Sequence, residues 1–142
     1  MSGRYALCVA RFYEDLAEEL VAGARTVLVA AGVGDPDIFD VPGAFELPLA
    51  ARYAALSGRY AGVVCLGAVI RGETSHYDHV CTEAARGIQQ VSLTTGVPCS
   101  FGVLTVESRE QALARLGPKR HQGRDAAEAV LAMSALRARL AT

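Results

Sequence analysis

The stretch VVCLGAVI, residues 63–70, is apolar at every position rather than at every second one. A strand with one face in water alternates between apolar and polar residues, whereas a strand covered on both faces does not need to. Strands of the second kind are typical of parallel sheets that carry helices on both sides. The stretch therefore predicts an α/β fold, and the sequence around it should alternate between strands and helices.

Strand-like apolar runs do alternate with segments of helical period along the chain. The runs are RYALCVA (4–10), DIFDV (37–41), YAGVVCLGAVI (60–70) and VPCSFGVLTV (97–106). Helical segments are expected over about 16–31, 44–57, 77–95, 108–116 and 124–141. This order predicts a single α/β domain, residues 1–142, with a four-stranded, mainly parallel sheet flanked by helices. Pairing of the N-terminal run elsewhere is left open.

The helical segments carry signs of amphipathy and of defined ends. Apolar residues recur in the first segment at steps of three and four, which predicts one stripe that covers a sheet. The stripe consists of Leu16, Leu20, Ala24, Val27, Leu28 and Ala31. Gly96 is expected to end the third segment, and Ser108 with Gln111 three residues later fits a capping box.

Composition limits the classes of function. A chain of 142 residues, 51% hydrophobic and 20% charged, can bury one compact core. The net charge is −1 and the 14 basic residues are spread along the chain, so we expect neither a nucleic-acid partner nor an anionic membrane. The start, MSGRYALCVARFYEDL, resembles neither a secretion signal nor a membrane span, and we expect a cytoplasmic location.

The four cysteines do not form a metal-binding pattern. Cys8, Cys65, Cys81 and Cys99 lie too far apart for any CxxC motif. Three of them lie within apolar runs, where cysteine usually acts as a small buried hydrophobe. Structural burial is therefore favoured over metal or redox chemistry, and no metal site is expected.

Ligands of parallel α/β sheets bind beyond the carboxyl ends of the strands. At one such end, the spacing from Gly67 to Thr74 resembles the P-loop pattern GxxxxGK[ST], with Glu73 at the lysine position. That difference argues against nucleoside triphosphates. A loop between a strand and a helix still presents backbone N–H groups and the positive end of the helix dipole, which suit a single phosphate. The alternative is an ordinary helix cap by Thr74 or Ser75.

Three side chains at these strand ends could contact a ligand, and each has a structural alternative. His76 can transfer protons at neutral pH, or can be a surface or packing residue as we expect for His79 and His121. Phe12 could stack on a planar heterocycle or pack against the first helix. Glu46 could accept hydrogen bonds from the N–H edge of a pyrimidine or cap a helix.

Five blocks of the chain, in order and at matching intervals, resemble the signature blocks of the lumazine synthases, which catalyse the penultimate step of riboflavin biosynthesis. They are ARF (10–12), VPGAFELP (41–48), LGAVIRGETSHYDHV (66–80), GIQQVSLTTGVPCSFGVLT (87–105) and ALARLGPK (112–119). The combination of PGAFE with GAVIRGETxHYD is highly specific, although neither the loop nor the histidine would be so alone. The resemblance implies a three-layer, flavodoxin-like fold.

The resemblance also implies a reaction. The family condenses 5-amino-6-(D-ribitylamino)uracil with (3S)-3,4-dihydroxy-2-butanone 4-phosphate to give 6,7-dimethyl-8-ribityllumazine, phosphate and water, without a metal or organic cofactor. It implies a homo-oligomer, at least a ring of five with sites shared between neighbours, and allows association with riboflavin synthase. A flavin- or lumazine-binding module and a silent shell-forming relative remain alternatives. The pair of His76 and Arg115 argues against both.

Site residues follow from the same resemblance. His76 matches the family's proton-transfer residue. The residues that match the family's contacts to the uracil substrate are Phe12, Ala44, Phe45, Glu46, Ala68, Val69, Ile70 and, from a neighbouring subunit, Phe101. Those that match its contacts to the butanone phosphate are Glu73, Thr74 and, from the neighbour, Arg115, whose guanidinium is suited to bidentate phosphate contact.

The chain departs from the family pattern at one residue and in one segment. Tyr13 stands where many members have asparagine. The segment KRHQG, residues 119–123, differs from the common TKAGNKG, with Gln122 at a lysine position. Arg120 or Arg124 could replace the missing charge. The contacts of this segment with substrate, and assembly beyond a small ring, are therefore left open.

Overall fold

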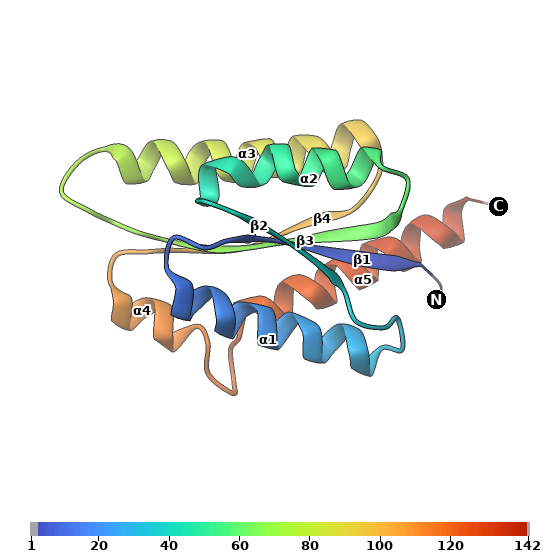
Figure 1. Ribbon diagram of the computed structural model, residues 1–142, viewed down its shortest axis with the longest axis horizontal. Coiled ribbons are helices and arrows are strands. Elements are labelled where there is room, and N and C mark those ends of the chain that lie inside the picture. Colours follow the sequence, from blue (N-terminus) through green and yellow to red (C-terminus); the bar gives the residue numbers. More distant parts are fainter. Residues whose placement is uncertain (1–2, 142) are drawn as a thin grey trace.

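The computed structural model describes residues 3–141. Strands and helices alternate in the predicted order (Figure 1). The elements are β1 (Arg4–Ala10), α1 (Glu14–Ala30), β2 (Asp37–Val41), the 3-10 helix η1 (Ala44–Glu46), α2 (Leu47–Leu56), β3 (Tyr60–Ile70), α3 (His76–Thr95), β4 (Cys99–Val106), α4 (Arg109–Ala114) and α5 (Gln122–Leu140). Among residues 3–141, no helix is both long enough and apolar enough to cross a membrane.

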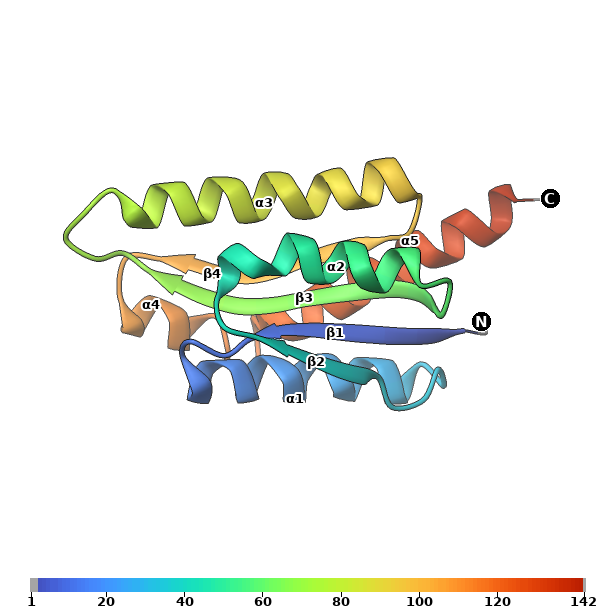
Figure 2. The same ribbon diagram turned by 45° about the horizontal axis from the view of Figure 1, so that its top comes forward.

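The four strands form one sheet in the order β2-β1-β3-β4, and every neighbouring pair is parallel. Helices α1 and α5 pack together on one face of the sheet, and α2 and α3 pack together on the other (Figures 1 and 2). The predicted three-layer α/β fold is therefore confirmed. Strand β1 pairs with both β2 and β3, so the alternative pairing of the N-terminal run is wrong.

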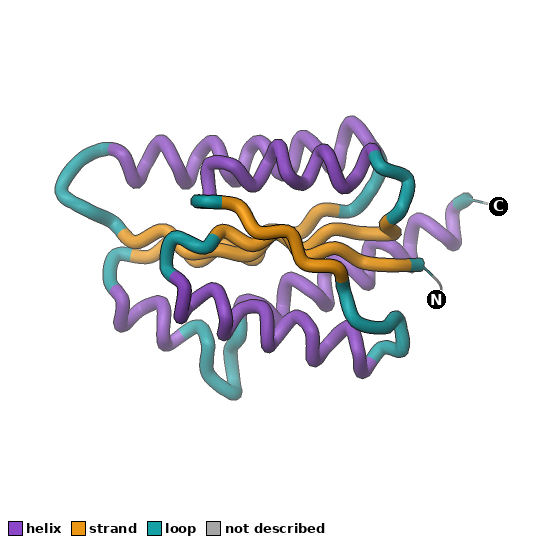
Figure 3. Tube along the Cα trace, viewed as in Figure 1, coloured by secondary structure: helices purple, strands orange, loops and turns teal. Residues whose placement is uncertain are grey.

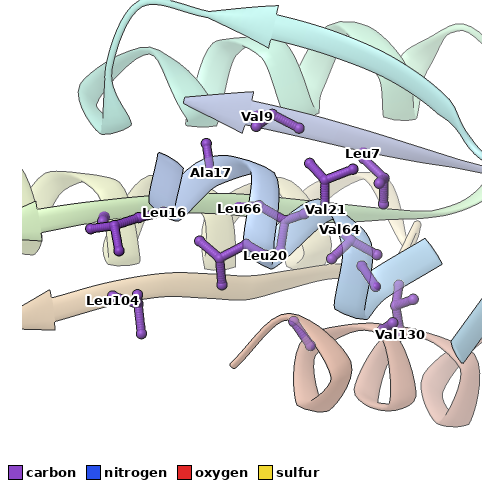
Figure 4. Packing of buried hydrophobic residues seen from close by; sticks show 14 of the residues in the cluster. Leu7, Val9, Leu16, Ala17, Leu20, Val21, Val64, Leu66, Leu104 and Val130 are labelled. Atoms are coloured by element: carbon purple, nitrogen blue, oxygen red, sulfur yellow. The ribbon is translucent and has the colours of Figure 1, made fainter. Parts of the chain in front are cut away.

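Each face of the sheet has its own hydrophobic layer, which explains the unbroken apolar run in β3. Residues 63–66 of that strand are fully buried. On one face, Leu16 and Leu20 of α1 pack against Leu66 of β3 (Figure 4). The other layer, under α2 and α3, contains Cys8, Cys65 and Cys99, which are buried free thiols as predicted. Burial of a large aliphatic side chain such as Leu16, Leu20 or Leu66 contributes roughly 1.5–3 kcal/mol to folding.

The predicted helix ends are accurate to about two residues, and tertiary contacts account for the differences. Helix α1 ends at Ala30, and Ala31 is an exposed cap residue, so its place in the predicted apolar stripe is wrong. Helix α4 ends at Ala114 rather than Leu116, because Leu116 pairs with His121 in an isolated antiparallel bridge. The same pairing places His121 at the N-cap of α5, which begins two residues earlier than expected.

Two of the predicted end signals are found in the structure, one of them in altered form. Gly96 ends α3 with a φ of 76°, in the left-handed region that favours glycine. The Ser108 hydroxyl accepts a hydrogen bond from the Gln111 N–H at 3.2 Å. The Gln111 side chain reaches back to the Glu107 N–H at 2.7 Å and not to Ser108, so the capping box is shifted by one residue.

Candidate active site

A cavity of about 450 Å³ lies at the carboxyl ends of β1 and β3. The chain leaves β1 toward β2 on one side and returns to β3 on the other, and open α/β sheets form their ligand crevice at such a switch point. The loops at this end connect strands to helices (Figure 3). The predicted site residues that line the cavity are Phe12, Ala44, Phe45, Glu46, Ala68, Val69, Ile70, Thr74 and His76.

A second hollow, of about 500 Å³, lies between α3, β4 and α5. Its lining is mainly apolar and includes Leu93, Met133 and Leu136. Polar groups that could orient a ligand and move protons converge instead on the first cavity, at the switch point of the sheet. The first cavity is therefore the candidate active site, although it is slightly smaller.

Two exposed aromatic rings border the cavity. Phe12 is 75% exposed and Phe45 is 57% exposed. The Phe12 ring makes an edge-on contact with Tyr13, with ring centroids 4.9 Å apart. A ring exposed to this extent does not pack under α1, so the structural alternative for Phe12 is not supported. Both rings leave an aromatic face free for a planar heterocycle.

Glu46 has a structural partner as well as a place in the cavity wall. Its Oε1 accepts a hydrogen bond from the Gly43 N–H at 2.9 Å, which is the capping role considered from the sequence. The same carboxylate lines the cavity, beside the buried Ala44 of the 3-10 turn. The hydrogen bond from Gly43 therefore holds in place an acceptor that a ligand N–H could share.

The loop before α3 presents free backbone donors. Ser75 is the N-cap of α3, but its side chain makes no capping hydrogen bond. Thr74 Oγ1 instead accepts from the His76 N–H at 3.2 Å. Within residues 3–141, the N–H groups of Gly72, Glu73 and Thr74 have no protein acceptor in hydrogen-bond range. They lie at the positive end of a long helix, where an anion is favoured.

His76 is the first residue of α3 and its exposed side chain borders the cavity. An imidazole at this position can face a bound molecule rather than the core. Glu73, by contrast, is exposed on the loop and lies outside the cavity lining. Its contribution to the site would come through its backbone N–H and not through its carboxylate.

Arg71 stabilises the loop before α3, a role that was not predicted from the sequence. Its N–H donates to the Val106 carbonyl at 2.9 Å, and its guanidinium bonds to Glu107 at 3.0 Å and to Asp78 at 3.1 Å. The guanidinium also lies 4.3 Å from the ring centroid of Tyr77. The hydrogen bond to Glu107, followed by that to Asp78, raises the pKa of Arg71. This cation is therefore committed to the loop and is not free for a phosphate.

The cavity thus combines exposed aromatic rings, free backbone N–H groups at the start of α3, which favour an anion, and a histidine. A model of the 6,7-dimethyl-8-ribityllumazine synthase family matches residues 2–138 of the chain. The chain belongs to this family. Lumazine synthases are transferases of riboflavin biosynthesis, so the resemblance of the sequence blocks is confirmed, together with the enzyme class.

Two residues that match lumazine synthase contacts do not reach the cavity of their own chain. Phe101 is half-buried on β4 and borders the second hollow. Arg115 caps the C-terminus of α4, where its Nη1 donates to the Gln111 carbonyl at 3.1 Å. The lining of the first cavity, as far as the structure describes the chain, contains no arginine or lysine.

The segment that departs from the lumazine synthase pattern is engaged in structural contacts. Arg124 Nη2 donates to the carbonyls of Gly117 at 3.0 Å and Pro118 at 2.8 Å, so this nitrogen is bonded within its own chain. Gln122 Nε2 donates to the Phe101 carbonyl at 3.4 Å. His121 is buried, which confirms the packing role expected for it, and burial lowers the pKa of its imidazole.

Metal-ligating side chains do not gather in the described structure. Among residues 3–141, no three His, Cys, Asp or Glu side chains are grouped so that they could hold a metal ion. The side chains that line the cavity include the imidazole of His76, the carboxylate of Glu46, the hydroxyls of Thr74, Tyr13 and Tyr77, and the rings of Phe12 and Phe45.

Proposed function

We propose that this chain condenses 5-amino-6-(D-ribitylamino)uracil with (3S)-3,4-dihydroxy-2-butanone 4-phosphate, giving 6,7-dimethyl-8-ribityllumazine, phosphate and water. The observation that carries the proposal is the meeting of Phe12, Glu46, Thr74 and His76 at one cavity, in a chain of the lumazine synthase family. These residues come from three different strand ends, so their meeting is a property of the fold and not of one motif.

The pyrimidine ring of the uracil substrate fits the apolar part of the cavity. An exposed Phe12 ring can stack on it, and Phe45 borders it from the turn after β2. Backbone groups of residues 44–46 and 68–70 line the same space and can hold the ring and its ribityl chain. Glu46, oriented by Gly43, can accept from a ring N–H.

The phosphate of the second substrate fits the loop before α3. Free N–H groups of residues 72–74 and the helix dipole favour a single anion there. A phosphate also needs a compensating cation, and none lines the cavity of one described chain. Arg115 of a neighbouring subunit would supply this cation, and Phe101 of the same neighbour would complete the binding site for the pyrimidine ring. This need for a cation, together with the family resemblance, which implies at least a ring of five, supports a homo-oligomer with shared sites. We also propose a cytoplasmic location.

The chemistry then requires little from the protein beyond position. The substrate amine attacks the ketone, and a Schiff base forms with loss of water. Loss of a proton and departure of phosphate leave an enol, which becomes a ketone, and the second nitrogen attacks this carbonyl and closes the ring with loss of a second water. His76 transfers protons between these steps. Because the nucleophile belongs to the substrate and phosphate is a good leaving group, holding the substrates together supplies most of the acceleration.

Passive binding of a flavin or lumazine is the second candidate, and a silent shell-forming relative is the third. Neither would require a histidine beside a loop of free backbone N–H groups. The deciding experiment incubates the wild-type protein with both substrates and follows the absorbance and fluorescence of the lumazine together with released phosphate. Equal amounts of lumazine and phosphate are expected. Tight binding of lumazine without turnover would reject the enzymatic proposal.

A further inference from the structure

The chain between α4 and α5 closes on itself. The Gln122 N–H donates to the Arg115 carbonyl at 2.9 Å, and Leu116 pairs with His121 as an isolated antiparallel bridge. The Arg124 side chain donates to the Gly117 and Pro118 carbonyl oxygens of this turn and so stabilises it. Residues 115–124, called the latch below, therefore form a bonded unit whose first residue is Arg115.

The latch is anchored on α1 by His121. A Cβ placed on Gly23 would lie 2.2 Å from His121 Cε1, so the imidazole fills the space that a side chain at Gly23 would need. The His121 Nδ1 accepts from the Arg124 N–H at 3.3 Å and thereby caps α5. The backbones of α1 and α5 also meet closely, because a Cβ on Gly123 would lie 2.3 Å from the Leu20 carbonyl oxygen.

Gln122 joins the latch to β4. Its backbone N–H bonds to the Arg115 carbonyl, and its side-chain Nε2 bonds to the Phe101 carbonyl at 3.4 Å. One residue thus contacts the backbones of Phe101 and Arg115, the two residues that the proposed function assigns to the neighbour's site. A shift of the latch would move Arg115 directly and would release Phe101 from its side-chain partner.

We infer that His121 and Gln122 are positioning residues, which hold Arg115 and Phe101 in the geometry needed to complete the neighbouring site. The inference rests on the proposed function. The His121 imidazole, packed against Gly23, fixes the latch to α1. Gln122 then holds Phe101 and Arg115 in place through its hydrogen bonds to their carbonyl groups.

Gly23→Ala tests the anchor without altering any latch residue. The new methyl must displace the imidazole, because its place is occupied. We expect the KM for the butanone phosphate to rise about tenfold, part of the hundredfold that a misplacement of about 1 Å can cost. The KM for the uracil substrate should change by less than about threefold, because β4 still holds Phe101 when its side-chain partner is lost, and the rings and amides of the other subunit remain. His121→Ala should act in the same direction, with partial rescue by His121→Asn.

A double-mutant cycle separates positioning from loss of stability. If the latch acts through Arg115, then Arg115→Ala should raise the KM for the butanone phosphate far less in the Gly23→Ala background than in the wild type. Leu28→Ala is the matched control, because Leu28 is buried in the core on the same helix, whereas the His121 imidazole lies against Gly23. It should lower the denaturation midpoint and leave both KM values unchanged.

Hydrogen exchange gives a readout that does not depend on catalysis. The Gln122 and Arg124 amides, protected by their bonds within the latch, should exchange faster in Gly23→Ala than in Leu28→Ala. Wild-type KM values in Gly23→Ala and His121→Ala, or full additivity with Arg115→Ala, would overturn the inference. A wild type that forms no lumazine would instead overturn the proposed function, and unchanged exchange in Gly23→Ala would overturn the anchor.

Discussion

The imidazole of His121 occupies the space beside the Gly23 Cα, so close that a Cβ on Gly23 would lie 2.2 Å from its Cε1. This contact joins α1 to the start of α5 and fixes the segment that begins at Arg115. Neither residue carries a signal in the sequence. Their pairing places a titratable group inside a structural contact, which makes the contact sensitive to pH.

Acid should weaken this contact. Burial, followed by the nearby positive charge of Arg124, lowers the pKa of His121, against the smaller influence of Glu19 and Asp125. As pH falls below the ordinary histidine pKa of about 6.5, the unfolded chain takes up this proton before the folded chain does. Stability that is present above that pH is therefore lost below it.

Urea denaturation at pH 7.5 and pH 5.5 checks this expectation. The wild type should lose more of its free energy of unfolding between these pH values than His121→Asn, in which the titrating group is absent. The exposed His79→Asn serves as the matched control and should retain the wild-type slope. Parallel pH dependences for the wild type and His121→Asn would show that the pKa of His121 is the same in the folded and unfolded chains, and would contradict the expectation.

Arg115→Ala should raise the KM for the butanone phosphate and leave binding of the uracil substrate almost unchanged. Charge-assisted hydrogen bonds of this kind contribute about 1.5–3 kcal/mol, or roughly 10- to 150-fold in affinity. Arg109→Ala removes the same charge from the same helix, where it pairs with Asp15, and should keep the wild-type KM. Equal weakening of both substrates by Arg115→Ala would contradict the assigned role.

His76→Ala should lower kcat while both substrates still bind. The expected fall is roughly ten- to a hundredfold, at the low end for acid-base groups, because the proximity of the substrates is retained. Steady-state kinetics with each substrate varied in turn measures this. His79→Ala, on the exposed surface of the same helix, is the control and should have wild-type kcat. Full activity of His76→Ala would leave His76 as an ordinary surface residue.

The buried thiols should be chemically silent in the folded protein. Burial raises the pKa of Cys99 to about 11. At pH 8 only about one thiol in a thousand would then be ionised, and the thiolate is the reactive form. Iodoacetamide followed by mass spectrometry should leave Cys8, Cys65 and Cys99 unlabelled in native protein and label them in urea. Half-buried Cys81 should react first, and native labelling of Cys99 at a free-thiol rate would refute its burial.

The fold could be predicted well because its signals are local. The unbroken apolar run of β3 indicates burial on both faces, and Gly96 marks the end of α3 by its own backbone preference. The chain turns after β1, β2 and β3 could likewise be placed at one edge of the sheet. Errors occurred where distant contacts decide, as at Leu116, whose bridge to His121 ends α4 early.

The candidate site was predicted less completely, for the same physical reason. Phe12, just after β1, and His76, which begins the helix after β3, could be expected at the cavity because both lie at the carboxyl ends of strands. The role of Arg71 depends on Glu107, which the parallel pairing of β3 with β4 brings beside it. The resemblance assigned Phe101 and Arg115 to a neighbour's site, and both lie away from the cavity of their own chain, but the contacts that hold them follow only from the three-dimensional structure.

A shared site makes a quantitative prediction about mixed assemblies. His76 lines the cavity of its own chain, whereas Arg115 does not, so each complete site would need an intact His76 from one subunit and an intact Arg115 from the next. Chains of His76→Ala and Arg115→Ala can be unfolded, mixed equally and reassembled at random. In a head-to-tail ring each partner is drawn independently, and about one quarter of the interfaces should then be intact.

Activity of the mixture should therefore rise well above that of either variant reassembled alone. Native mass measurement must show hybrid rings, and a mixture of the two variants without unfolding provides the matched control, in which no rise is expected at first. Hybrid rings with no gain in activity would exclude a site shared between His76 and Arg115. Because each variant retains the group that the other lacks, a gain can arise only where the two chains meet, and its size reports the fraction of repaired interfaces.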